Sequence, residues 1–106
     1  MEQQHSSPSA VYELTYILRP TLTDDEVGIA AEAIVEDLTS AGAVVDGMND
    51  FLGKRRLAYQ IDGYQDGHYV VLTSFLATLA QRKAIDRRMR ERTAVLRHIT
   101  IRKDDL

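Results

Sequence analysis

Basic residues suited to binding phosphate are concentrated near one end of the chain. Residues 1–50 hold ten acidic residues and one base, Arg19, a net charge of −9, whereas residues 82–103 hold nine bases and two acids, a net charge of +7. Seven of those nine bases are arginine, whose planar guanidinium group can bind two phosphate oxygens at once. Because a polyanion responds to charges within about 10 Å, a chain with a net charge of −3 can still bind nucleic acid through its basic end.

Two groups of residues have the chemistry for binding RNA or a partner protein. The triplet Lys54-Arg55-Arg56 lies three residues before Tyr59. The tyrosine ring can stack on an unpaired base or pack at an interface, and it can equally lie in a protein core. A second group lies near the end of a predicted helix, where arginines either contact phosphate or form only a solvated helix end. This second group comprises Arg88, Arg90 and Arg92.

Residues with catalytic or metal-binding chemistry are few. The chain has no cysteine, which excludes disulfides, thiolate nucleophiles and cysteine-bound metals. Its three histidines lack metal-ligand spacing, and a single histidine on a strand, as expected for His98, is more often packed or in contact with a partner than a ligand. The carboxylates of residues 24–26 suit the positive end of a helix dipole, and the glycines form no phosphate-binding loop. We therefore expect no enzyme, no metal, no cofactor and no small-molecule substrate.

Length and composition indicate a single soluble domain. The chain has 106 residues, of which 44% are hydrophobic and 27% charged, and no apolar run approaches the roughly 18 residues of a membrane span. Residues 1–10 are polar and small, which predicts a disordered lead rather than a signal peptide. The domain is expected over residues 11–103, followed by a short acidic end at residues 104–106. We expect a cytoplasmic protein without membrane contact.

The first half of the chain predicts a strand, a helix and further β-structure. Residues 11–18 alternate with a period of two, which is typical of a strand with one strongly apolar face. Thr23 and Glu26 form a capping-box pattern at the start of a helix over residues 24–41. Residues 43–61 are rich in β-formers, and they predict one long strand, or two strands joined by a bulge, bent near Gly53.

The second half predicts a hairpin, a helix and a last strand. Residues 62–67 are dense in turn-forming types, and residues 69–75 form a strand that pairs with the preceding one. A second capping box precedes a helix with a thin apolar stripe, in which Arg82 contributes only its aliphatic stem. The pattern of residues 95–102 predicts a strand. The capping residues are Thr78 and Gln81, and the stripe comprises Leu79, Arg82, Ile85, Asp86 and Met89.

The order β-α-β-β-α-β predicts an α+β ferredoxin-like sandwich, with two helices on one face of a four-stranded antiparallel sheet. The other face of such a sheet is open. Neither face of the last strand is clearly polar, and Val11 and Ile17 are apolar residues on the open side of the first strand. An apolar open face favours a partner, although the sheet can equally pair with a second copy of itself.

Four short motifs stand in order along the chain: Tyr12-Glu13-Leu14 with Leu18 and Pro20, the segment Leu52–Ile61, Gly67-His68-Tyr69, and Val95-Leu96-Arg97-His98. In residue types and in spacing they closely resemble the bacterial small-subunit ribosomal protein six family. The resemblance extends over about residues 11–103, and its most specific part is the segment with Leu57-Ala58-Tyr59 after the basic triplet.

This resemblance implies a non-enzymatic component of the small ribosomal subunit in translation. Such a protein binds the central domain of 16S rRNA together with small-subunit ribosomal protein eighteen, which covers exposed sheet surface. The resemblance places the basic triplet and Tyr59 nearest the RNA or the partner, and it adds Arg97 and His98 to the same assembly surface. The alternative from another class is a self-associating ferredoxin-like domain that senses a ligand between paired sheets.

Overall fold

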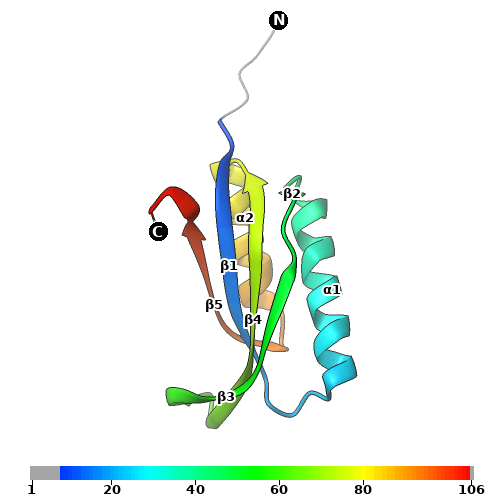
Figure 1. The fold of residues 1–106 in the computed structure, drawn as a ribbon, viewed down its shortest axis with the longest axis vertical. Coiled ribbons are helices and arrows are strands. Elements are labelled where there is room, and N and C mark those ends of the chain that lie inside the picture. Colours follow the sequence, from blue (N-terminus) through cyan, green and yellow to red (C-terminus); the bar gives the residue numbers. More distant parts are fainter. Residues whose placement is uncertain (1–7, 106) are drawn as a thin grey trace, which may run out of the picture.

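The protein is a sheet covered on one face by two helices, as the computed structural model shows for residues 8–105 (Figure 1). All pairings in the sheet are antiparallel, and β4 and β1 form its centre. The elements are β1 (Ala10–Leu18), α1 (Asp24–Ser40), β2 (Val44–Val45), β3 (Asn49–Ile61), β4 (Tyr64–Ala77), α2 (Leu79–Glu91), β5 (Val95–Arg102) and a 3-10 turn (Lys103–Asp105).

The ferredoxin-like α+β architecture expected from the sequence is confirmed, with one more strand than expected. The β-rich stretch after α1 forms two strands, β2 and β3, which both pair with β4. The short connection between them stays against β4, because Gly47 donates its amide to Ser74 O, and a Cβ at Gly47 would lie 2.5 Å from Ser74 N. The expected bulge lies within β3, where the register shifts between Phe51 and Gly53.

Both helices begin at the capping boxes that the sequence predicts. The Thr23 side chain accepts a hydrogen bond from the Glu26 amide, and the Glu26 carboxylate accepts one from the Thr23 amide. Thr78 and Gln81 repeat this arrangement at α2. Helix α1 ends one residue before the expected boundary, and Gly42 follows it with φ of +100°, a conformation that glycine adopts without strain.

The hairpin between β3 and β4 has a shorter turn than the turn-forming residues predict. Only Asp62 and Gly63 make the turn, with φ values of +51° and +83°, and β4 already begins at Tyr64. Gly67 therefore lies inside the strand rather than in a loop. A Cβ at Gly67 would lie 2.3 Å from Ile17 Cγ2, so this glycine permits close packing of β4 against β1.

Strand β1 starts one residue earlier than expected, and a short turn follows β5. Strand β1 begins at Ala10, within the polar lead expected over residues 1–10, and residues 1–7 lie outside the described part of the chain. Asp104 belongs to the 3-10 turn after β5, while residue 106 lies outside the description.

The main core lies between the sheet and the two helices. It contains Leu14, Tyr16 and Leu18 of β1, as expected, together with Phe75 of β4 and Ile85 and Met89 of α2, all of which are fully buried. Leu79 departs from the predicted stripe of α2, because its side chain is 50% exposed at the first position of the helix.

The buried phenol of Tyr16 predicts a loss of stability in alkaline solution. Its hydroxyl donates to Asn49 Oδ1 at 3.4 Å, and burial raises the pKa of Tyr16 above the ordinary value of 10.0. Above that pH the unfolded chain loses the phenolic proton and the folded chain retains it, so the free energy of unfolding falls as pH rises. The fall should be about 1.4 kcal/mol per pH unit steeper than in a Tyr16→Phe variant.

Urea unfolding of both proteins between about pH 9 and about pH 11 measures this difference. The Phe variant is the control, because it differs from the natural chain only in the phenol hydroxyl of residue 16. Parallel pH profiles would show that the folded protein exposes the phenol of Tyr16 to ionisation.

Candidate nucleic-acid interface

The basic triplet lies on β3, in the part of the β3–β4 hairpin that extends past the helices at the lower end of Figure 1. All three side chains are exposed. Because side chains alternate along a strand, Lys54 and Arg56 point to one side and Arg55 to the other. Arg55 Nε donates to Leu52 O at 3.2 Å, and Arg56 Nη2 donates to Gln65 Oε1 at 3.4 Å. The triplet therefore presents positive charge on both sides of the hairpin.

Tyr59 lies near the end of the same hairpin and is 68% exposed. The sequence allowed Tyr59 to lie either at a binding surface or in the core, and the core position is therefore wrong. Its neighbours Leu57 and Ile61 are instead buried. An exposed tyrosine beside basic side chains provides a stacking surface for an unpaired base.

A small second core connects the hairpin to the start of β5. Leu57 and Ile61 of β3 pack with Leu96 of β5 on the face of the sheet opposite the helices, and Ile17 packs against the same cluster. This cluster brings the basic hairpin to the end of the molecule where α2 stops and β5 begins. The two candidate groups, which are far apart in the sequence, are therefore neighbours.

A hollow of about 430 Å³ lies at this junction and contains several of the candidate residues. Arg90, Arg97 and His98 line it, together with Arg19 from the end of β1. The Arg19 side chain donates to Thr93 O, and its guanidinium carbon lies 5.4 Å from the centre of the Tyr64 ring. Arg92 lines it as well, so the hollow has four arginines along its wall, together with the acids Asp62 and Glu91.

Arg19 is a functional candidate that the sequence patterns do not identify. It is the only base in residues 1–50 and precedes Pro20 at a strand end. Only the pairing of β1 with β5, which places Leu18 opposite Val95, brings Arg19 to the arginines of the second half. Strand pairing of this kind is not encoded in any local pattern.

Arg88 and Arg92 both contact Asp37 of α1, although Arg92 also lines the hollow beside Arg90. Arg92 donates to Asp37 through Nε at 2.5 Å and Nη2 at 3.1 Å, and Arg88 Nη1 lies 3.4 Å from Asp37 Oδ1. The hydrogen bond to Asp37 raises the pKa of Arg92. Arg92 and Arg88 therefore join α1 to α2, and only part of each guanidinium faces solvent.

His98 lies on the helix side of β5, opposite Tyr16 in the register, whereas Arg97 lies on the open side opposite Ile17. His98 Nε2 donates to Asp86 Oδ1 of α2 at 3.2 Å, and Thr100 donates to the same oxygen at 2.9 Å. The histidine thus packs β5 against α2, while its edge reaches the arginine-lined hollow.

The open face of the sheet carries exposed apolar side chains above the second core. Val11 of β1 is 38% exposed and Ile99 of β5 is 55% exposed, and their strands are neighbours. Exposed apolar groups on adjacent strands are typical of a surface that a partner covers. Among residues 8–105 there is no cluster of three or more histidines and acids arranged to hold a metal ion. Neither helix in that range is long and apolar enough to cross a membrane.

The fold and the arginine-lined end together define a class of protein: a small ferredoxin-like binding protein with one strongly basic end. A family model described as Ribosomal protein S6 matches residues 11–102. The chain is 40% identical over 93 residues to small ribosomal subunit protein bS6 of Desulforudis audaxviator, which covers 88% of this chain and 97% of the relative. It is 38% identical over 97 residues to the protein of the same name from Trichormus variabilis, covering 91% and 87% of the two chains.

The chain belongs to the ribosomal protein S6 family. It is therefore a structural component of the small ribosomal subunit, in the cytoplasm. The crystal structure of 30S ribosomal protein S6 from Thermotoga maritima has the same fold, with a TM-score of 0.82 over 92% of this chain and 91% of the other at 21% identity. The resemblance to this family that the four sequence motifs indicate is therefore confirmed.

Proposed function

We propose that the protein binds the central domain of 16S rRNA with its arginine-lined end and binds small-subunit ribosomal protein eighteen with the open face of its sheet. The observation that supports RNA binding is the second core, which gathers the basic hairpin, Arg90 and Arg97 at one end. Phosphate contacts from such a surface position the protein on a folded RNA, which is recognised mainly by shape.

The residues of the basic end divide into two roles on this proposal. The basic triplet, Arg90, Arg97 and Tyr59 contact RNA directly. Arg92, Arg88 and His98 hold α2 in place against α1 and β5, and they add positive charge near the RNA. The apolar open face, including Ile99, packs against the partner protein, and the two surfaces meet at the second core.

The proposal predicts binding that depends on salt, on the partner and on the basic triplet. Affinity of the full chain for a central-domain rRNA fragment should fall steeply as salt rises from roughly 50 mM to roughly 200 mM, because bound phosphates release counterions. Protein eighteen should strengthen the binding. Replacing Lys54, Arg55 and Arg56 together by alanine should weaken it by about tenfold or more, as measured by filter binding or fluorescence anisotropy.

The matched control replaces Lys83, Arg87 and Lys103 by alanine, because these three bases are exposed and do not line the arginine hollow. The charge change is the same in both variants, so equal losses would show that net charge rather than the hairpin determines binding. A chain that forms a stable dimer and binds no RNA in any condition would instead favour the ligand-sensing alternative.

A further inference from the structure

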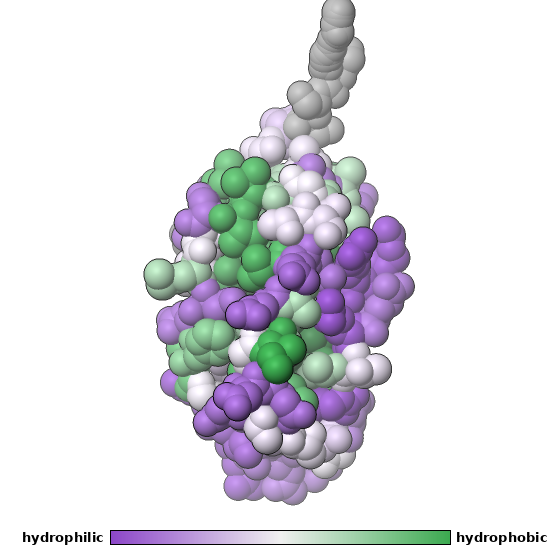
Figure 2. All heavy atoms as spheres, turned by 90° about the vertical axis from the view of Figure 1, so that its right-hand side faces the viewer, coloured by the Kyte–Doolittle hydropathy of each residue, from purple (hydrophilic) through white to green (hydrophobic). Residues whose placement is uncertain are grey.

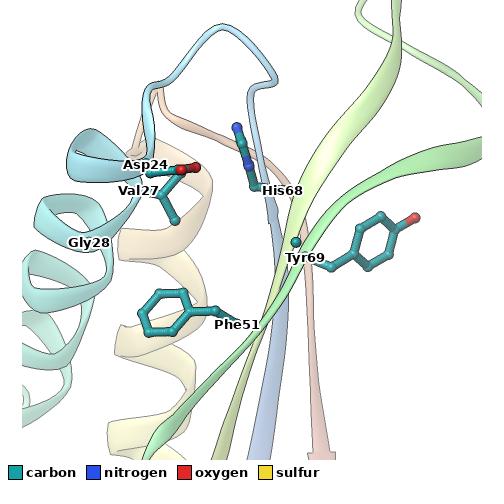
Figure 3. Close-up of a pocket in the computed structure, with 7 residues that line it drawn as sticks. Asp24, Val27, Gly28, Phe51, His68 and Tyr69 are labelled. Carbon is teal, nitrogen blue, oxygen red and sulfur yellow. The ribbon is translucent and has the colours of Figure 1, made fainter.

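A second hollow lies on the opposite side of the molecule from the sheet's open face, between the first turns of α1 and strand β3. It encloses about 280 Å³. Figure 3 shows the Phe51 ring of β3 pointing across the gap toward α1, where Val27 and Gly28 face it, while the Tyr69 ring points away from the gap. Phe51 is 52% exposed, so the hollow is open to solvent along an apolar wall.

Gly28 lines this hollow. It lies inside α1, where glycine lowers helix stability relative to alanine. No positive φ requires it, and a Cβ built on Gly28 would meet nothing within 4 Å. Gly47 and Gly67 differ in this respect, because a Cβ at either would collide with neighbouring atoms. Neither packing nor backbone geometry therefore requires glycine at position 28, and a large side chain there would enter the groove between α1 and Phe51.

The α1 side of the hollow is negatively charged, whereas His68 lines the β4 side. Asp24 lines it, and Glu32 lies four residues after Gly28, on the same face of α1 and also exposed. Glu36 continues this row by one more turn. Residues 20–50 contain no lysine or arginine. In the pairing of β3 with β4, the base closest to the hollow is Lys54. It lies opposite His68, at the end of the hollow toward the hairpin turn. Figure 2, which faces this side, shows apolar patches surrounded by hydrophilic side chains.

We propose that the hollow between α1 and β3 docks a lysine- and arginine-rich segment of another protein. One aliphatic side chain of that segment enters between Gly28 and Phe51, and its basic residues lie along α1 toward Glu32 and Glu36, away from Lys54. Charge complementarity selects this occupant. The acidic rim repels RNA, and residues 1–9 of this chain contain no lysine or arginine. The surface adjoins the one proposed for RNA only at Lys54, so both can be occupied together.

The test uses the full-length chain labelled with ¹⁵N and a synthetic peptide of about a dozen lysines and arginines with one central leucine. A matched peptide carries serine in place of leucine. The amide resonances of Gly28, Phe51 and Gly53 should shift on addition of the leucine peptide. The serine peptide should bind at least about fivefold more weakly, because it lacks the apolar anchor.

Gly28→Leu is the decisive variant, because it fills the hollow while improving the helix. It should weaken binding of the leucine peptide by about tenfold or more and leave the melting temperature unchanged or higher. Gly28→Ala, which adds one methyl group, is the control for helix stability and should bind nearly as the natural chain does. Asp24→Asn with Glu32→Gln should weaken binding chiefly at low salt.

Unchanged peptide affinity in Gly28→Leu overturns the proposal, as does equal affinity for the two peptides. Shifts of the same resonances on raising the protein concentration alone would show that a second copy is the occupant. Shifts of these resonances on adding an RNA oligonucleotide would assign the hollow to RNA. The Gly28→Leu variant should bind the rRNA fragment as the natural chain does. The peptide test therefore gives a result even if the protein does not bind RNA.

Discussion

Replacing Arg19, Arg90 and Arg97 together by alanine should lower the affinity for a central-domain rRNA fragment by about a hundredfold at moderate salt. Arg19 directly follows β1, Arg90 lies in α2 and Arg97 in β5, and the three side chains line one hollow of about 430 Å³. Each guanidinium can bind a phosphate there, so the slope of log K against log salt should decrease by about three. A salt titration of the natural chain and the variant measures both quantities.

The same charge change at Lys83, Arg87 and Lys103 is the control for this prediction, and its slope should remain close to that of the natural chain. Arg19 also contacts Thr93 O and the Tyr64 ring, so urea unfolding must show that the triple variant is folded at the temperature of the binding assay. A folded variant with undiminished affinity would show that the hollow does not contact RNA.

Local features of the fold are predictable from the sequence because each depends on a few neighbouring residues. Both capping boxes, the alternation of β1 and the left-handed residue after α1 follow from single residues with strong conformational preferences. The length of the hairpin turn is not predictable in this way. Gly67 has the residue type of a turn, yet its position in β4 is determined by the approach of Ile17, which belongs to a strand about fifty residues earlier.

The candidate site is predictable in its composition but not in its geometry. The concentration of arginine after residue 81 identifies which residues carry positive charge. It does not show that Arg92, the residue after α2, binds Asp37 as well as lining the hollow with Arg90, because only tertiary packing decides what each side chain meets. Arg19 is not predictable from a local pattern either, because strand pairing brings it to the other arginines. The exposure of Tyr59 also depends on packing, since its neighbours Leu57 and Ile61 fill the second core instead.

The separation of charge along the sequence becomes a separation in space. Helix α1 presents carboxylates on its exposed surface, and the junction of α2, β5 and the β3–β4 hairpin presents arginines. Asp37 is the point where the two regions meet, because it is a buried acid of α1 that contacts two arginines of the α2 end. We therefore expect the Asp37 carboxylate to stabilise the fold and to weaken RNA binding.

Replacing Asp37 by alanine should lower the free energy of unfolding by about 2 kcal/mol, between the values typical of exposed and of fully buried ion pairs. The intermediate value follows because the Asp37 side chain is 12% exposed, whereas that of Arg92 is 35% exposed and can turn toward water. Asp37→Asn retains an oxygen that accepts a hydrogen bond from Arg92, so it should lose less. Urea unfolding of both variants at neutral pH measures the difference.

The same variants should bind the rRNA fragment about threefold more tightly than the natural chain, at a temperature where they are folded. Removing the carboxylate frees Arg88 and Arg92 from their partner and raises the local charge by one, which increases phosphate attraction at low salt. A fall in affinity would contradict this expectation. It would show that Asp37 holds Arg92 in the orientation that RNA requires, and that the ion pair belongs to the binding surface rather than competing with it.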